Sequence, residues 1–123
     1  MGDDLANTRV LLVEDEALLA LDLEMTLEDS GCTVVGAFPT VGTALAELAR
    51  SWPDAAVLDL NLNGETSLAV ADVLADRGVP YIFVTGYDRD HLPARHQNAP
   101  LIVKPYSAPE LLRTLRRALD QDR

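Results

Sequence analysis

Short apolar segments alternate with longer amphipathic stretches along the chain. The apolar segments are rich in valine, isoleucine and leucine and lack the alternating polar positions of a half-exposed strand. Such runs are typical of strands that are covered on both faces of a parallel sheet. The pattern predicts five strands, at Arg9–Val13, Thr33–Ala37, Ala55–Leu58, Tyr81–Val84 and Leu101–Val103.

The stretches between the strands predict helices. Ala17–Asp29 places Leu19, Leu23 and Leu27 on one face and is followed by Gly31, a residue type that commonly ends a helix. We therefore expect this helix to cover one face of the sheet with its leucines.

Capping residues mark the starts of the later helices. Thr40 and Ser67 can each accept a hydrogen bond from a first-turn amide. Ser107 and Glu110 match a capping box before a final leucine-rich helix. The stretch Asp88–Pro100 has two prolines and weak periodicity, so we expect any helix there to be short or mobile.

Strands that alternate with helices predict an α/β fold with right-handed crossover connections. We expect a flavodoxin-like, doubly wound five-stranded parallel sheet in the order 2-1-3-4-5, with helices on both faces. A length of 123 residues and a hydrophobic fraction of 48% fit one compact domain. We assign that domain to residues 9–120, between tails at 1–8 and 121–123.

Polar side chains follow the carboxyl ends of four predicted strands. Glu14 and Asp15 follow the first strand, Asp59 the third, Thr85 the fourth and Lys104 the fifth. Open α/β folds place their sites at this edge of the sheet. Each residue alone has an ordinary structural explanation, such as negative charge at a helix N-terminus. Together, three carboxylates, a hydroxyl and an ammonium can hold Mg²⁺ and a phosphoryl group.

Four short motifs occur in order along the chain: Val13-Glu14-Asp15, Val57-Leu58-Asp59, Val84-Thr85 and Val103-Lys104-Pro105-Tyr106. In this order and separation they resemble the response-regulator receiver domain, and the resemblance covers almost the entire chain. The resemblance implies that Asp59 accepts a phosphoryl group from a phosphohistidine on a sensor kinase. It also implies a signalling domain that catalyses its own phosphorylation and dephosphorylation, rather than an enzyme.

The expected cofactor is Mg²⁺, a hard cation that prefers oxygen ligands. Asp15 and Asp59 can bind it directly, and Glu14 more plausibly acts through water. The backbone carbonyl of Asn61 is the third protein ligand that the resemblance implies.

Lys104 and Thr85 are expected to contact the phosphoryl group. Lys104 would pair with one phosphoryl oxygen, and Thr85 would hydrogen-bond another and thereby pull on the following loop. The resemblance also implies a cis peptide bond between Lys104 and Pro105 that aims the lysine inward.

A narrower resemblance is to the single-domain receivers named for a Phe-Ala-Thr-Gly-Tyr run, which stands here as Phe83 to Tyr87 with Val84 in place of alanine. Leu101 occupies the position of the usual switching aromatic residue, and Leu62-Asn63-Gly64 replaces the usual Met-Pro. Our hypothesis is that the segment from Gly86 to Pro100 orders or shifts on phosphorylation instead, with Tyr87 best placed to supply a ring.

Two other functions compete with this one. A Mg²⁺-dependent phosphohydrolase of the haloacid-dehalogenase type also uses an aspartate nucleophile, but it carries a second aspartate two residues later, where this chain has Asn61. A phosphorylation-independent protein-binding module is the third option. It is disfavoured because the acceptor, metal and lysine positions are all filled.

Composition limits the partners. Acidic residues outnumber basic ones by 20 to 10, so nucleic acid and anionic membranes would repel the chain. A lone Cys32 and the absence of a signal peptide or apolar span favour the cytoplasm. His91 and His96 are expected to be exposed loop histidines. The expected partners are a sensor histidine kinase or phosphotransfer protein and a downstream protein, with the fifth strand and last helix as docking surface or homodimer interface.

Overall fold

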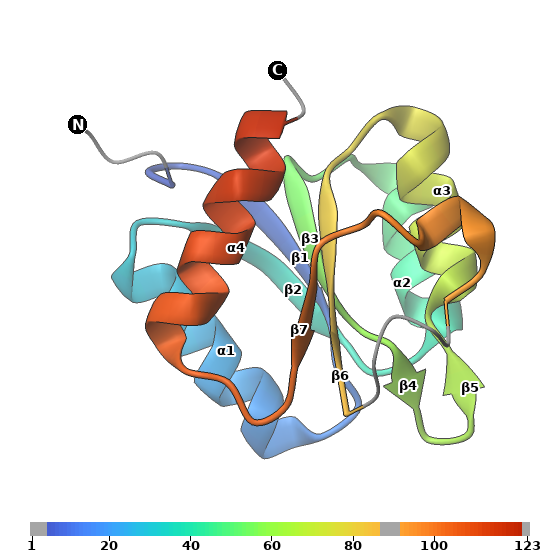
Figure 1. The fold of residues 1–123 in the computed structure, drawn as a ribbon, viewed down its shortest axis with the longest axis horizontal. Helices are drawn as coiled ribbons and strands as arrows, with labels where there is room; N and C mark the ends of the chain where they lie inside the picture. Colours follow the sequence, from blue (N-terminus) through green and yellow to red (C-terminus); the bar gives the residue numbers. More distant parts are fainter. Residues whose placement is uncertain (1–4, 87–91, 122–123) are drawn as a thin grey trace.

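The computed structural model describes residues 5–86 and 92–121. Its main sheet has five strands, all parallel, in the order β2-β1-β3-β6-β7 (Figure 1). This is the predicted 2-1-3-4-5 order, which is therefore confirmed. The strands are β1 (Arg9–Val13), β2 (Thr33–Phe38), β3 (Ala55–Asp59), β6 (Tyr81–Thr85) and β7 (Leu101–Val103).

Helices cover both faces of the sheet, as predicted. Figure 1 shows α1 and α4 on one face and α2 and α3 on the other. The right-handed crossovers of a parallel sheet require such a division between layers. The helices are α1 (Ala17–Asp29), α2 (Val41–Arg50), α3 (Leu68–Arg77) and α4 (Ala108–Gln121).

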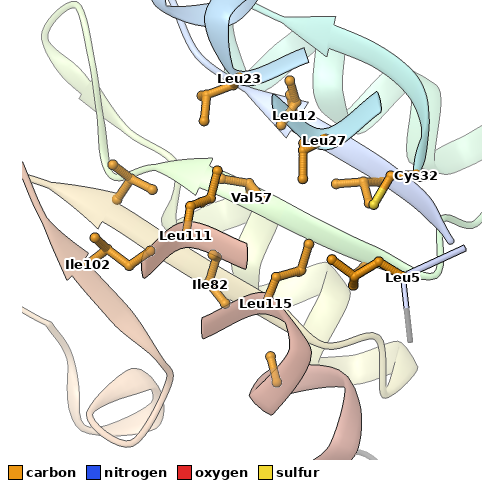
Figure 2. Close-up of a cluster of buried hydrophobic side chains, with 14 residues drawn as sticks. Leu5, Leu12, Leu23, Leu27, Cys32, Val57, Ile82, Ile102, Leu111 and Leu115 are labelled. Carbon is orange, nitrogen blue, oxygen red and sulfur yellow. The ribbon is translucent and has the colours of Figure 1, made fainter. Parts of the chain in front are cut away.

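The core has two parts, one on each side of the sheet. Successive side chains of a strand point to opposite faces, so Leu12 packs with α1 and α4 while Leu11 packs with α2 and α3. Figure 2 shows the α1 and α4 side, where Leu23 and Leu27 of α1 and Leu111 of α4 share one apolar cluster with Leu12. Because both faces of the sheet are covered, its strands carry apolar residues throughout.

The capping predictions are confirmed at two helices and wrong at one. The Thr40 hydroxyl accepts from the Thr43 amide at 3.1 Å, and the two residues form a reciprocal capping box. The Ser107 hydroxyl accepts from the Glu110 amide at 3.2 Å, which confirms the serine as a cap and is one of the two bonds of the predicted capping box. Ser67 precedes α3, but its hydroxyl makes no capping bond and is buried without a hydrogen-bond partner.

Helix α1 buries a narrower face than its leucines predict. Leu23 and Leu27 are buried, as expected, but Leu19 is 37% exposed. Ala20 takes the place of Leu19 among the buried residues of this helix. The expected leucine face is therefore only partly correct, and other large apolar residues of α1 point to solvent.

A small antiparallel hairpin follows β3 and was not predicted. It consists of β4 (Asn61–Leu62) and β5 (Glu65–Thr66), joined by Asn63 and Gly64. Both joining residues have positive φ, at 53° and 96°. An Asn-Gly pair with two positive φ angles is the preferred two-residue hairpin turn, so the sequence did contain the signal for this element.

In the described part of the β6–β7 connection, residues 92–100, Ala94–His96 forms a short 3₁₀ helix, which agrees with the expectation of a short helix. His96 is only 1% exposed, so the prediction of an exposed histidine is wrong at this position. Its ring is buried because Asp72 and Tyr81 supply hydrogen-bond partners from other elements. Tyr87 and His91, about which we also made predictions, lie outside the described residues.

Within residues 5–86 and 92–121, no helix combines the length and apolar character needed to cross a membrane.

Candidate functional site

The predicted site residues stand at the carboxyl ends of neighbouring strands. Asp59 is the last residue of β3 and pairs with Val84 on β6, and Thr85 ends β6 one residue later. Glu14 follows β1 directly, and its amide donates to the Phe38 carbonyl at the end of β2. The parallel register therefore brings residues that are far apart in sequence to one edge of the sheet.

Three carboxylates form a compact cluster at this edge. Glu14, Asp15 and Asp59 each offer an oxygen, and these atoms lie within 4.8 Å of one another. Glu14 and Asp59 are 4% and 5% exposed, whereas Asp15 is half-buried. Burial of like charges at this spacing is costly unless cations compensate them.

Asp59 is held from two sides. Its Oδ2 lies 3.2 Å from the Lys104 ammonium, and its Oδ1 accepts from the Asn61 amide at 3.2 Å. The Lys104 amide in turn donates to the Thr85 carbonyl at 2.8 Å, and the Lys104-Pro105 bond is cis, as the family resemblance implied. The carboxylate is thereby fixed in one orientation.

Burial and mutual repulsion shift the titration of this site. Burial raises the pKa of Glu14 to about 7 against the opposing hydrogen bond from the Glu16 amide, and the Asp59 charge adds to the increase. Burial lowers the pKa of the Lys104 ammonium, but Asp59 and Glu14 outweigh burial and leave it raised. Burial, with these carboxylates nearby, raises the pKa of Tyr106 to about 12. The site therefore carries excess negative charge and favours added positive charge.

An open cavity of about 640 Å³ lies over this edge of the sheet. Asp15, Asp59, Asn61 and Lys104 are in its lining, as expected of a shared site. Thr85 is not in the lining and is fully buried. The cavity therefore gives access to the Asp59 carboxylate and the Lys104 ammonium, but not to the Thr85 side chain.

Three residues that the sequence analysis did not select as site residues also line the cavity. Glu16 lies at the start of α1, Asn63 lies on the β4–β5 hairpin, and Gly86 directly follows β6. Asn63 could have been recognised from the Asn-Gly turn, which places it close to the end of β3. Glu16 had no comparable signal, because a third consecutive acid is ordinary at a helix start.

The donor set fits a hard divalent cation. Only carboxylate oxygens gather in the cluster, and the raised pKa of Glu14 shows that the cluster favours added positive charge. Carboxylates and waters are the ligands that Mg²⁺ prefers, whereas sulfur and imidazole ligands would favour other metals. The acidic cluster can therefore hold Mg²⁺.

Comparison with known proteins identifies a matching family and similar proteins. Residues 10–116 match the response regulator receiver domain. The sensory transduction protein RegX3 of Mycolicibacterium smegmatis is 42% identical, with 94% of this chain and 54% of that protein covered. The phyllosphere-induced regulator PhyR of Methylorubrum extorquens is 35% identical, with 91% and 43% covered. The chain spans about half the length of these curated relatives.

Solved structures have the same fold. The solution structure of SdrG from Sphingomonas melonis Fr1 has a TM-score of 0.79 and 40% identity, with 97% of this chain and 98% of that chain covered. The response regulator PhyR from Brucella abortus has a TM-score of 0.82 and 30% identity, with 98% and 52% covered. The sheet order, the acidic cluster and these matches agree, and the chain belongs to the response regulator receiver domain family of two-component signal transduction.

Proposed function

We propose that the domain accepts a phosphoryl group on Asp59 from a protein phosphohistidine and passes the signal to a protein partner. The observation that carries this proposal is the fixed Asp59 carboxylate, which faces an open cavity between the Lys104 ammonium and the Asn61 amide. A carboxylate in this position is presented to a reactant instead of being hidden in a structural ion pair.

Mg²⁺ would be held by Asp15 and Asp59 directly, by Glu14 through water and by the backbone carbonyl of Asn61. The carboxylate cluster supports this assignment. Bound Mg²⁺ would offset the charge of the carboxylates and of the incoming phosphoryl oxygens. Binding would also favour the ionised form of Glu14, whose pKa is raised to about 7.

In the transfer, an Asp59 oxygen attacks phosphorus in line with the phosphorus–nitrogen bond of the donor. The new phosphorus–oxygen bond makes an acyl phosphate, and the donor imidazole leaves with the electron pair of the broken bond. Lys104 stabilises the charge on the phosphoryl oxygens, and its raised pKa keeps it cationic at neutral pH. Hydrolysis of the acyl phosphate, catalysed by the same domain, would end the signal.

Two features support protein partners in place of nucleic acid or a membrane. The net charge of −10 repels both of those polyanionic surfaces. Helix α1, which begins just after Asp15, exposes Leu18, Leu21 and Met25 at helical spacing. We assign this apolar stripe to the phosphodonor, a sensor histidine kinase or phosphotransfer protein, because a donor that reaches Asp59 passes beside α1.

We further propose that the chain belongs to the Phe-Ala-Thr-Gly-Tyr subclass and works in the cytoplasm as a stand-alone receiver over residues 9–120. The likeness to SdrG, which spans 98% of that chain, supports this. One similar structure is that of the anti-anti-sigma factor PhyR from Bartonella quintana, and an output through protein contacts fits such relatives. The exposed Val103 on edge strand β7 suits a downstream partner or a homodimer contact.

Intact mass after exposure to Mg²⁺ and acetyl phosphate tests the proposal. We expect a labile phosphoryl adduct on the wild type that requires Mg²⁺ and is absent from Asp59→Asn. The haloacid-dehalogenase alternative instead predicts steady phosphate release from monoester substrates. A wild type that binds Mg²⁺ but takes no phosphoryl group from acetyl phosphate or from phosphorylated kinases would refute the proposal in favour of a binding module.

A further inference from the structure

A buried histidine links three elements on the α2 and α3 side of the sheet. His96, in the β6–β7 connection, places its Nδ1 2.6 Å from the Tyr81 hydroxyl and its Nε2 2.8 Å from the Asp72 carboxylate of α3. The ring also makes edge contacts with Tyr81 and Phe83 of β6. Both ring nitrogens thus have hydrogen-bond partners, and the histidine is only 1% exposed. In sequence it lies far from the residues of the carboxylate cluster.

Polar contacts tie the same stretch to α3. Arg95 forms ion pairs with Asp72, at 3.5 Å, and with Asp76. A surface cavity of about 260 Å³ is lined by Arg95, Ala99 and Pro100, by residues 78–81 and by Ala118 of α4. Residues 92–99, which we term the clamped segment, are therefore tied to α3 and β6 by specific polar bonds, in addition to the apolar packing of Leu92 and Ala99. The segment borders free space at Arg95 and Ala99.

The clamped segment and Thr85 are mechanically related. Strand β6 runs from Tyr81, which bonds His96, to Thr85, which ends the strand at the proposed phosphorylation site. Thr85 is fully buried, so its hydroxyl can meet a phosphoryl oxygen in the cavity only after its surroundings rearrange. If this rearrangement shifts the β6–β7 connection, the bonds that hold the clamped segment oppose it.

We infer that the Asp72–His96–Tyr81 chain is a clamp that holds residues 92–99 against α3 in the unphosphorylated protein and opposes its phosphorylated arrangement. His96 is then a positioning residue: it acts through β6 and never touches the phosphoryl group. The inference rests on the proposed function, since the opposed arrangement is the one that phosphorylation of Asp59 would favour. A change that weakens the clamp should favour the opening of residues 92–99 by some factor. The population of the opposed arrangement should rise by the same factor.

The test compares Tyr81→Phe with the wild type, because this change removes one hydroxyl and keeps the ring. Hydrogen exchange is measured at the amides of His96, Gln97 and Ala99, which donate within the clamped segment. The initial rate of Asp59 phosphorylation by acetyl phosphate with Mg²⁺ is measured alongside it. We expect both rates to rise about fivefold, as for the loss of one ordinary hydrogen bond.

Two further variants separate the clamp from general destabilisation. Asp72→Ala removes the other partner of His96 at a half-exposed position and should act in the same direction as Tyr81→Phe. Val70→Ala, a buried position of α3 itself, loosens the core without removing a polar group of the hydrogen-bonded chain and should not speed phosphorylation. Gain of rate is the decisive readout, because a merely structural role would leave the rate unchanged or lower it.

Several results would overturn the inference. It is refuted by unchanged exchange in Tyr81→Phe, by faster exchange without faster phosphorylation, or by an equal gain of rate in Val70→Ala. A wild type that takes no phosphoryl group would refute the proposed function, and with it the coupling to phosphorylation. The exchange data would then still decide separately whether the hydrogen-bonded chain holds residues 92–99.

Discussion

Glu14 is an almost fully buried carboxylate of the acidic cluster. Burial raises its pKa to about 7 from an ordinary value of 4.5, so the folded protein keeps this proton after the unfolded chain has lost it. Between these two pH values the unfolded state binds fewer protons, and stability falls as pH rises. The carboxylate therefore costs stability at neutral pH, as expected of a group kept for binding and not for folding.

We predict that without Mg²⁺ the free energy of unfolding falls by about 1 to 2 kcal/mol from pH 5 to pH 7.5 through Glu14. This is less than the full shift implies, because solvent reaches the site from its open side. Urea unfolding in EDTA measures the fall, and Glu14→Gln should flatten it. Saturating Mg²⁺ should also reduce it, since the cation favours the ionised carboxylate. A fall of equal size in Glu14→Gln would assign it to another group.

At the scale of the helix, two hydroxyl-bearing N-cap residues differ in whether the hydroxyl forms a capping hydrogen bond. The Thr40 hydroxyl accepts from the Thr43 amide, whereas the Ser67 hydroxyl is buried without a partner. We predict that Thr40→Ala destabilises the domain by about 1 kcal/mol and that Ser67→Ala is neutral or stabilising. Chemical denaturation of both variants checks this contrast. A loss in Ser67→Ala as large as in Thr40→Ala would show that the serine hydroxyl is satisfied in solution.

Strand β2 has a glycine where a side chain does not fit. The register of β2 against β1 shifts just before Gly36, whose φ is +154°. A Cβ built there would lie 2.7 Å from the Phe38 ring. We predict that Gly36→Ala costs about 1 to 3 kcal/mol, since the ring must move and the backbone is strained.

The control for this prediction is Gly42→Ala in α2, where a new Cβ meets nothing within 4 Å. Alanine favours the helix, so this change should stabilise by up to about 1 kcal/mol. Thermal unfolding of the two variants under one set of conditions should therefore move in opposite directions. If both changes are neutral, the clash with Phe38 is relieved by rotation of its ring.

Elements were predictable from sequence where one local pattern decides them. Strands such as Ala55–Asp59, buried along their whole length, differ clearly from the amphipathic stretches beside them. The sequence could not identify the buried face of α1, because this helix carries apolar residues on several of its faces. It also could not predict the burial of His96, whose partners Tyr81 and Asp72 lie 15 and 24 residues away and meet it only in the folded chain.

The same distinction holds for the site. Glu14, Asp15, Asp59 and Lys104 were predictable because parallel strands bring their carboxyl ends to one edge, a consequence of topology alone. The limited access to Thr85 was not predictable, because it depends on how the surrounding chain packs. Roles in phosphoryl transfer remain predictions until phosphorylation is measured.

On the scale of the whole molecule, helix α1 exposes an apolar region on a protein whose net charge is −10. Leu18, Leu21 and Met25 of α1 are 82%, 52% and 55% exposed, at positions that share one helix face. Exposed acids such as Asp22 and Glu28 lie on the same helix. An apolar stripe with an acidic surround suits a partner helix that is apolar at its centre and basic at its edge.

We predict that Leu18→Glu and Met25→Glu slow phosphoryl transfer from a phosphorylated kinase or phosphotransfer protein at least tenfold and leave phosphorylation by acetyl phosphate unchanged. The small donor needs only the cavity at Asp59, whereas a protein donor must also bury the stripe. Arg50→Glu, an equally exposed change on α2 in the opposite layer, is the control and should affect neither rate. Equal slowing with both donors would place the effect in the site itself. Unchanged transfer from a donor that phosphorylates the wild type would assign the stripe to another partner, and a lower mass by sedimentation would identify that partner as a second copy of this chain.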